Sequence, residues 1–136
     1  MKSLIIIRHA KSSWDSASDF ERPLDGRGLD DAKLMGNVLA DKKINLDMIV
    51  SSPARRAITT AKIIADQIKF KNEIKEEKYI YGASSQDLFS MITKLDDKIN
   101  SVAVVGHNPA LHILSENLSN ERFMTFPACS VVHISF

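Results

Sequence analysis

The chain has 136 residues, of which 44% are hydrophobic and 26% are charged, and this size and balance predict a single domain, residues 1–136, with a core of its own. Its 18 basic and 17 acidic side chains leave a formal net charge of +1, so we expect neither nucleic acid nor a membrane surface as a partner. One cysteine, Cys129, rules out an internal disulfide framework and favours a cytoplasmic protein, and the apolar run near the N-terminus is too short for an export signal or a membrane span.

The first half of the chain alternates between strand and helix patterns. Residues 4–7 are all apolar, which is typical of a strand that is covered on both faces. Asp25 is a suitable N-cap for a helix over 26–43, where apolar residues keep helical spacing. A second apolar run, 48–50, precedes a helix that is expected to begin at Pro53 and to bury one apolar face as far as Ile68.

The second half continues the same alternation. Residues 73–81 predict a third, more exposed strand, and 86–95 predict a helix. We expect that helix to bury Leu88, Phe89, Ile92 and Leu95. Residues 102–105 form another apolar run, a further helix begins at Pro109, and 129–136 are rich in β-branched and aromatic residues that favour a last strand.

This order of elements predicts a three-layer α/β/α sandwich with a mostly parallel central sheet. In such sheets, ligands bind beyond the carboxyl ends of the strands. Three of the predicted strands end in polar groups that could serve a ligand there: Arg8 and His9, residues 51–56, and residues 106–109. The functional site is therefore expected where these three strand ends meet.

If the three strand ends lie side by side, they bring together His9, His107, Arg8 and either Arg55 or Arg56. Arginine grips phosphate oxygens with two parallel hydrogen bonds and keeps its charge at any working pH. Two helices also begin at this edge, and helix N-termini favour anions. These features predict a phosphate site.

The histidines add chemistry to that site. Neighbouring cations disfavour the protonated imidazole, so His9 would keep a lone pair at neutral pH and could attack phosphorus. The sequence has no compact cluster of carboxylates or cysteines beside these residues, which disfavours a metal-dependent reaction. We therefore expect catalysis without a metal ion or another cofactor.

Several motifs resemble the histidine phosphatase superfamily, also called phosphoglycerate mutase-like. They are Arg8-His9-Ala10, SSPARRAITTA from Ser51, and GHNP from Gly106. RPL at 22–24 and YGAS from Tyr81, together with the short chain, are most similar to the SixA-type phosphohistidine phosphatase branch. The resemblance implies a phosphoglycerate mutase-like fold and extends over nearly the whole chain.

The resemblance also implies roles for individual residues. His9 corresponds to the nucleophile that becomes phosphorylated, and Arg8 and His107 correspond to residues that bind and polarise the phosphoryl group. Periodicity alone leaves Arg55 and Arg56 open, but the family's phosphate-binding arginine aligns with Arg56. Arg22, in the RPL motif, corresponds to a further phosphate ligand.

Many members of the family also carry a carboxylic acid that protonates the leaving oxygen. Glu76, Glu77, Asp19 and Asp87 are all candidates for this acid, and the sequence does not select one of them. A site without a dedicated acid suits a leaving imidazole better than an alkoxide, because imidazole leaves more readily. The expected substrate is therefore phosphohistidine on a protein such as a phosphotransfer domain.

Two alternatives remain at this point. The same chemistry could act on a small phosphomonoester or serve a mutase, although the chain is short for the segments with which mutases enclose their substrates. A phosphate-binding module without catalysis is a third interpretation, and the two histidines argue against it, since arginines and backbone N–H groups would suffice for binding.

Overall fold

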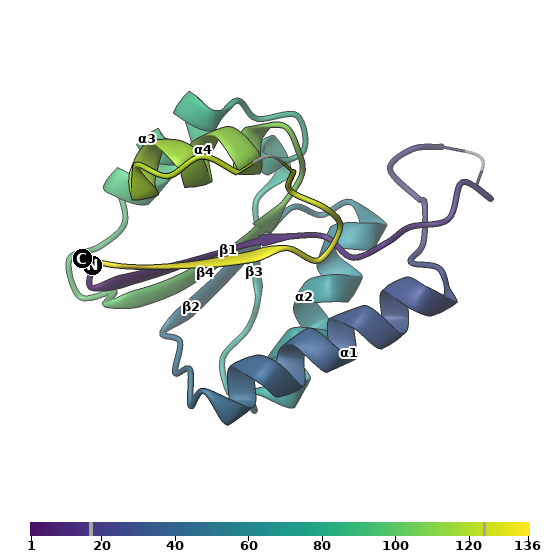
Figure 1. Ribbon diagram of the computed structural model, residues 1–136, viewed down its shortest axis with the longest axis horizontal. Helices are drawn as coiled ribbons and strands as arrows, with labels where there is room; N and C mark the ends of the chain where they lie inside the picture. The colour runs from purple at the N-terminus through teal and green to yellow at the C-terminus, as the bar shows by residue number, and fades with distance from the viewer. Residues whose placement is uncertain (17, 124) are drawn as a thin grey trace.

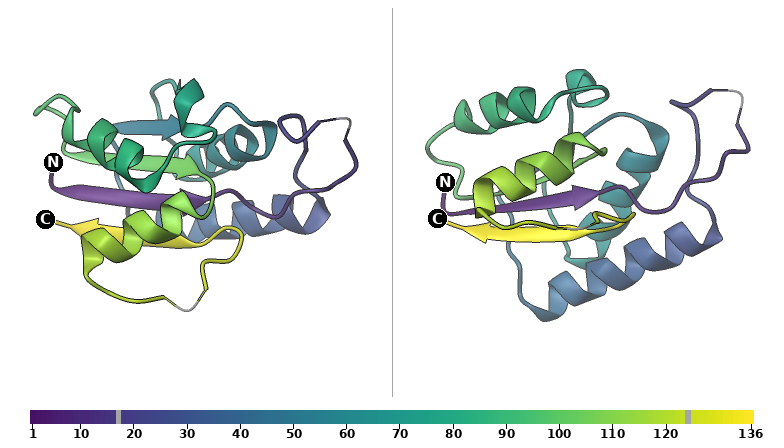
Figure 2. Two further views of the ribbon diagram at one scale, coloured as in Figure 1. Left: turned by 90° about the horizontal axis from the view of Figure 1, so that it is seen from above. Right: turned by 45° about the horizontal axis from the view of Figure 1, so that its top comes forward.

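A central sheet organises the molecule. Over residues 1–16, 18–123 and 125–136, which the computed structural model describes, five strands form one sheet in the order β3-β2-β4-β1-β5. The strands are β1 (Ser3–Arg8), β2 (Met48–Ser51), β3 (Lys75–Glu76), β4 (Ser101–Gly106) and β5 (Val131–Ser135). β5 pairs antiparallel with β1, and the other three pairings are parallel (Figure 2). The prediction of a mostly parallel sheet is confirmed.

Helices cover both faces of this sheet. They are α1 (Gly26–Asp41), α2 (Arg55–Gln67), the 3₁₀ turn η1 (Lys78–Ile80), α3 (Ser85–Thr93) and α4 (Ala110–Ser119). α1 and α2 lie on one face and α3 and α4 on the other (Figure 1), so the three-layer sandwich is also confirmed. Within the described ranges, no helix is both long enough and apolar enough to cross a bilayer.

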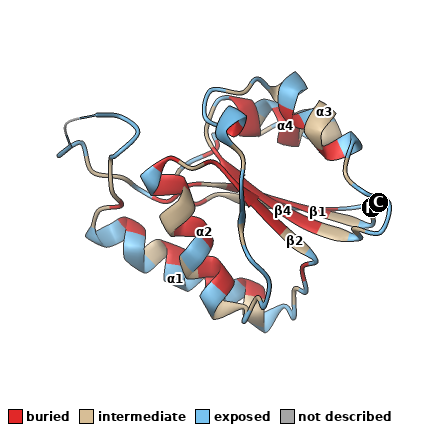
Figure 3. Cartoon of the chain, turned by 180° about the vertical axis from the view of Figure 1, so that it is seen from behind, coloured by how far each residue is buried: buried red, intermediate tan, exposed pale blue. Residues whose placement is uncertain are grey.

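β1 shows why the central strands are apolar throughout. Leu4 and Ile6 belong to the core between the sheet and α3 and α4, whereas Ile5 and Ile7 belong to the core against α1 and α2. Side chains alternate between the two faces of a strand, so a strand between two helical layers needs an apolar residue at every position. The buried centre of the sheet is visible in Figure 3.

The register of the strands brings three chain segments to one edge. Arg8 at the end of β1 is paired with Gly106 at the end of β4, and Ser51 at the end of β2 is paired with Val105. The residues that follow β1, β2 and β4 therefore leave the sheet side by side, as the sequence predicted.

The expected third strand is much shorter than 73–81. Only Lys75–Glu76 pairs with β2, and η1 follows after Glu77, whose backbone N–H donates to the carbonyl of Ser51. The turn carries Ile80 into the core, where it is 3% exposed. A continued strand would leave this large apolar side chain without that burial.

Two helix predictions also needed correction. The helix expected from Pro53 begins at Arg55, two residues later. In α3, Leu88 and Ile92 are buried as expected, but Phe89 is 48% exposed and Leu95 lies beyond the helix end. Phe89 is next to Leu88, so its side chain points about 100° away around the helix.

Gly28 explains how the long loop after β1 is held against α1. A Cβ atom on Gly28 would lie 2.0 Å from the carbonyl oxygen of Lys11, so only glycine permits this approach. The N-cap Asp25 donates its backbone N–H to the same carbonyl oxygen of Lys11. These contacts fix both ends of the loop that carries Arg22.

Candidate active site

One cavity at the carboxyl edge of the sheet brings together all five residues that the sequence analysis selected. The cavity has a volume of about 420 Å³, and the selected residues that line it are Arg8, His9, Arg22, Arg56 and His107. Arg8 is the last residue of β1, Arg56 lies in the first turn of α2, and Arg22 comes from the loop before α1. The other lining residues are Lys11, Ser12, Trp14, Asn108 and Ala128.

His9 is held with one particular ring nitrogen turned toward the cavity. Its Nδ1 lies 2.8 Å from the carbonyl oxygen of Ala10, and because a carbonyl only accepts, Nδ1 carries the proton. The lone pair of the neutral ring is therefore on Nε2. The next peptide is also fixed, because the N–H of Ala10 donates to the buried Thr60 hydroxyl at 3.0 Å.

His9 is neutral at physiological pH. The residue is only 8% exposed, and this burial lowers the pKa of the His9 ring to about 4. The nearby charges of Arg56 and Arg8 act in the same direction. A neutral ring with an available lone pair is what a nucleophile needs.

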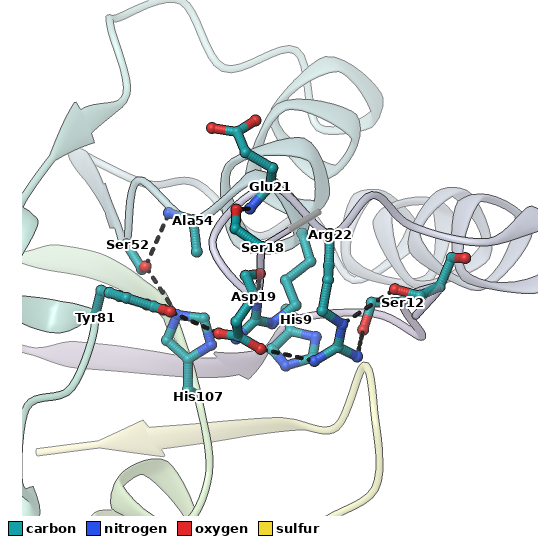
Figure 4. Close-up of polar contacts among 12 residues, drawn as sticks. His9, Ser12, Ser18, Asp19, Glu21, Arg22, Ser52, Ala54, Tyr81 and His107 are labelled. Carbon is teal, nitrogen blue, oxygen red and sulfur yellow. Dashed lines mark hydrogen bonds and ion pairs between the residues drawn. The ribbon is translucent and has the colours of Figure 1, made fainter. Parts of the chain in front are cut away.

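His107 faces His9 across the site, with the two ring centroids 5.2 Å apart. Its Nε2 lies 2.8 Å from the hydroxyl oxygen of Ser52, as Figure 4 shows. Its Nδ1 is buried and has no hydrogen-bond partner among the described residues. Burial first, and then His9 and Arg56, lower the pKa of His107 to about 3, so this ring is also neutral.

The arginines present donors to the same space. Arg8 donates from Nη1 to the carbonyl oxygen of Phe126 at 2.9 Å, and the side-chain amide of Asn108 donates to that oxygen at 2.8 Å. Burial, followed by the charge of Arg56, lowers the pKa of Arg8. Arg56 is 6% exposed whereas Arg55 is exposed, so the structure brings Arg56 to the cavity and leaves Arg55 in solvent. The Nε atoms of Arg8 and Arg56 are buried and have no protein partner among the described residues.

Asp19 connects two of these arginines. Its carboxylate accepts from Arg22 Nη1 at 3.0 Å and from the hydroxyl of Tyr81 at 2.6 Å (Figure 4). It also accepts from Arg56 Nη2 at 3.1 Å. The hydrogen bond from Tyr81, followed by that from Arg22, holds the pKa of Asp19 well below its usual range. Asp19 is therefore an ionised carboxylate that holds guanidinium groups and carries no proton at neutral pH.

Arg22 is held on several sides. Its Nε donates to the carbonyl oxygen of Ser13 at 3.0 Å and its Nη2 donates to the hydroxyl of Ser12 at 2.6 Å. The indole ring of Trp14 covers the guanidinium, with the ring centroid 3.5 Å from its central carbon, although Trp14 is 80% exposed. The loop thus orders Arg22 at the mouth of the cavity.

The remaining acid candidates lie elsewhere. Glu76, Glu77 and Asp87 are not among the residues that line the cavity, and Glu77 forms an ion pair with Lys75. Sequence reasoning did not select Ser52 or Asn108, which contact the site. Ser52 directly follows β2 and Asn108 is the second residue after β4, and this position at the carboxyl edge was the signal that could have identified them.

Comparisons with known proteins agree with this geometry. The family model of the histidine phosphatase superfamily (branch 1) matches residues 4–79. The phosphohistidine phosphatase SixA of Escherichia coli (strain K12) is 27% identical over 135 residues, which span 97% of this chain and 84% of that protein. A structure of a candidate phosphohistidine phosphatase SixA from Agrobacterium tumefaciens has a TM-score of 0.91 and 26% identity, covering 98% of this chain and 91% of that one. The structure of a protein histidine phosphatase SixA complexed with tungstate shares the fold, with a TM-score of 0.90 and 24% identity over 98% of this chain and 88% of the other.

Proposed function

The chain belongs to the histidine phosphatase superfamily (branch 1) and is a phosphatase, and from this premise we propose that it hydrolyses phosphohistidine on a protein through a covalent intermediate on His9. The observation that carries the proposal is the neutral His9 ring, whose Nε2 lone pair shares a cavity with the guanidinium groups of Arg8, Arg22 and Arg56.

In the first step, Nε2 of His9 attacks phosphorus and the bond from phosphorus to the leaving nitrogen of the substrate breaks. The electron pair of that bond stays on the leaving nitrogen, and a proton that the substrate ring takes up from solvent lets it leave as neutral imidazole. The guanidinium groups of Arg8, Arg22 and Arg56 bind the phosphoryl oxygens while charge moves through the transition state. In the second step, water attacks phosphorus, phosphate leaves, and His9 is regenerated as the neutral ring.

The acids near the site support the choice of phosphohistidine as the substrate. No carboxylate is among the lining side chains in the described part of the chain, and Asp19 beside them is ionised. An alkoxide needs a proton donor in order to leave, whereas an imidazole nitrogen, with a reference pKa of about 6.5, leaves more readily. These features favour phosphohistidine over an alkyl phosphate, in agreement with the activity named for the SixA relative.

The charges of the cavity also favour a reaction without a metal ion. Four cationic side chains line the cavity, namely Arg8, Lys11, Arg22 and Arg56. A divalent cation prefers carboxylate oxygens to such a ring of positive charges. The cationic side chains themselves supply the charge stabilisation that a metal would otherwise give.

A turnover comparison tests this proposal. The purified protein is given a histidine-phosphorylated phosphotransfer domain, phosphoserine and p-nitrophenyl phosphate in parallel, each with and without a chelator. We expect the phosphohistidine protein to give the highest kcat/KM, with no effect of the chelator. Faster hydrolysis of the esters would instead assign a phosphomonoesterase, and loss of activity with chelator would overturn the metal-independent mechanism.

A further inference from the structure

Ser52 makes a contact with His107 that the reaction described above leaves unexplained. Ser52 directly follows β2, is 0% exposed, and has its hydroxyl oxygen 2.8 Å from Nε2 of His107. The same oxygen accepts the backbone N–H of Ala54 at 3.2 Å. The hydroxyl is therefore held between a peptide at the entry to α2 and the second histidine of the site (Figure 4).

The hydrogen-bonding capacity of this hydroxyl decides where its proton lies. A serine hydroxyl has one proton to donate and two lone pairs with which to accept. One lone pair of Ser52 is used by Ala54, and among the described residues only Nε2 of His107 is positioned to take the proton. If Nε2 carried a hydrogen instead, the buried O–H of Ser52 would have no acceptor there, and an unpaired buried polar group is destabilising.

We propose that Ser52 is a positioning residue that donates its hydroxyl proton to Nε2 of His107 and thereby fixes the Nδ1–H tautomer of that ring. Which nitrogen of a histidine carries the proton is set by the hydrogen bond that the other nitrogen makes. Nδ1 of His107 is buried without a protein partner among the described residues, and it lies on the ring edge turned toward His9 (Figure 4). The tautomer therefore directs an N–H group, and not a lone pair, at the phosphoryl oxygens.

The two histidines then carry the proton on the same nitrogen and yet present opposite groups to the substrate. His9 uses its Nδ1–H on the carbonyl of Ala10 and presents the Nε2 lone pair. His107 uses its Nε2 lone pair on Ser52 and presents Nδ1–H. Ser52 thus separates the donor ring from the nucleophilic ring, although both rings are neutral.

The test reads the tautomer directly by NMR. In protein with ¹⁵N-labelled histidine, the nitrogen shifts and the couplings to ring protons distinguish a protonated ring nitrogen from an unprotonated one. The His107→Asn variant assigns the His107 signals by their disappearance. We expect the wild-type protein to show a protonated Nδ1 and an unprotonated Nε2 for His107, and Ser52→Ala to lose this preference. Ser51→Ala is the matched control, since Ser51 is equally buried but its hydroxyl donates to the backbone carbonyl of Ser52.

Kinetics add a second readout, and this part of the inference depends on the proposed function. Ser52→Ala is expected to lower kcat by roughly tenfold or more, and Ser51→Ala to change it by no more than a few fold. Complete loss of a hydrogen-bond donor to the transition state lowers kcat by about 100-fold to 1,000-fold, and a His107 ring with a mixed tautomer loses only part of that donation. A wild-type His107 with its proton on Nε2 overturns the inference, as does a Ser52→Ala variant with unchanged tautomer and turnover. The wild-type spectrum decides the tautomer even if the phosphohistidine protein is not a substrate or if Ser52→Ala does not fold, so the two proposals fail separately.

Discussion

The rings of His9 and His107 face each other at a centroid distance of 5.2 Å, and one nitrogen of each ring forms a hydrogen bond with a neighbouring residue. The carbonyl of Ala10 holds Nδ1 of His9, and the hydroxyl of Ser52 holds Nε2 of His107. The nitrogens without such a contact are Nε2 of His9 and Nδ1 of His107, and the proposed reaction uses these two.

The two adjacent arginines of α2 should differ sharply in their effect on turnover. Arg56→Ala removes a buried guanidinium from the cavity. We expect the activation barrier to rise by on the order of 3 kcal/mol, so that kcat/KM falls roughly a hundredfold. Arg55→Ala, one residue earlier on the exposed side, is the matched control and should change kcat/KM by less than about threefold. Equal effects of the two substitutions would remove Arg56 from the proposed phosphate site.

Asp19 should act on the arginines and not as an acid. Asp19→Asn weakens the hold on Arg22 and Arg56, so we expect kcat/KM to fall by roughly tenfold for phosphohistidine and for phosphate esters alike. A general acid would behave differently, because its loss would slow ester hydrolysis far more than phosphohistidine hydrolysis. The ratio of the two rates in wild type and variant is the measurement, and a strong selective loss of ester hydrolysis would contradict the assigned role.

The stability of the fold should depend on pH through the two site histidines. Their pKa values of about 4 for His9 and about 3 for His107 lie below the reference value of about 6.5 expected in the unfolded chain. As the pH falls below 6.5, the unfolded state therefore takes up protons that the folded state does not, and the free energy of unfolding decreases until the folded pKa values are reached. Between pH 7 and pH 5 we expect a loss of about 2 kcal/mol for each histidine.

Urea denaturation at pH 7 and pH 5 measures this loss. His9→Gln should remove about half of the difference, and a variant that lacks both histidines should remove most of it. A wild-type protein that is equally stable at the two pH values would show that neither ring is held neutral by burial.

Gly28 should be essential for packing the loop against α1. Gly28→Ala places a methyl group against the carbonyl oxygen of Lys11, so we expect the free energy of unfolding to fall by about 1–3 kcal/mol. Gly26→Ala is the control, since no atom lies within 4 Å of the position of its added Cβ, and it should be neutral or slightly stabilising. Thermal and urea denaturation of both variants check this, and an unaffected Gly28→Ala would contradict the close approach.

The parts of the site that could be predicted from the sequence are those that follow from strand order. Arg8, His9 and His107 each directly follow, or end, an apolar strand, and the carboxyl ends of parallel strands must share one edge of the sheet. Their convergence could therefore be predicted without coordinates, as could the two buried layers that the all-apolar strands require.

Other features depend on contacts that no local pattern records. Adjacent residues on a helix point about 100° apart, so periodicity alone leaves Arg55 and Arg56 open, and before the packing was known only the resemblance to the family motif favoured Arg56. Asp19 lies in a loop without periodicity, and its partner Tyr81 is distant in the sequence. The third strand ends at Glu76 because its partner β2 ends at Ser51, and the chain then turns and buries Ile80.

The bond that forms at His9 during turnover can be trapped in a rapid-quench experiment. The enzyme is mixed with a ³²P-phosphohistidine protein, stopped in alkali within the first turnover, and digested for identification of the labelled residue. We expect a base-stable, acid-labile label on Nε2 of His9, and neither label nor turnover in His9→Ala. Hydrolysis at the wild-type rate by His9→Ala, or a label on another residue, would contradict the proposed bond at His9.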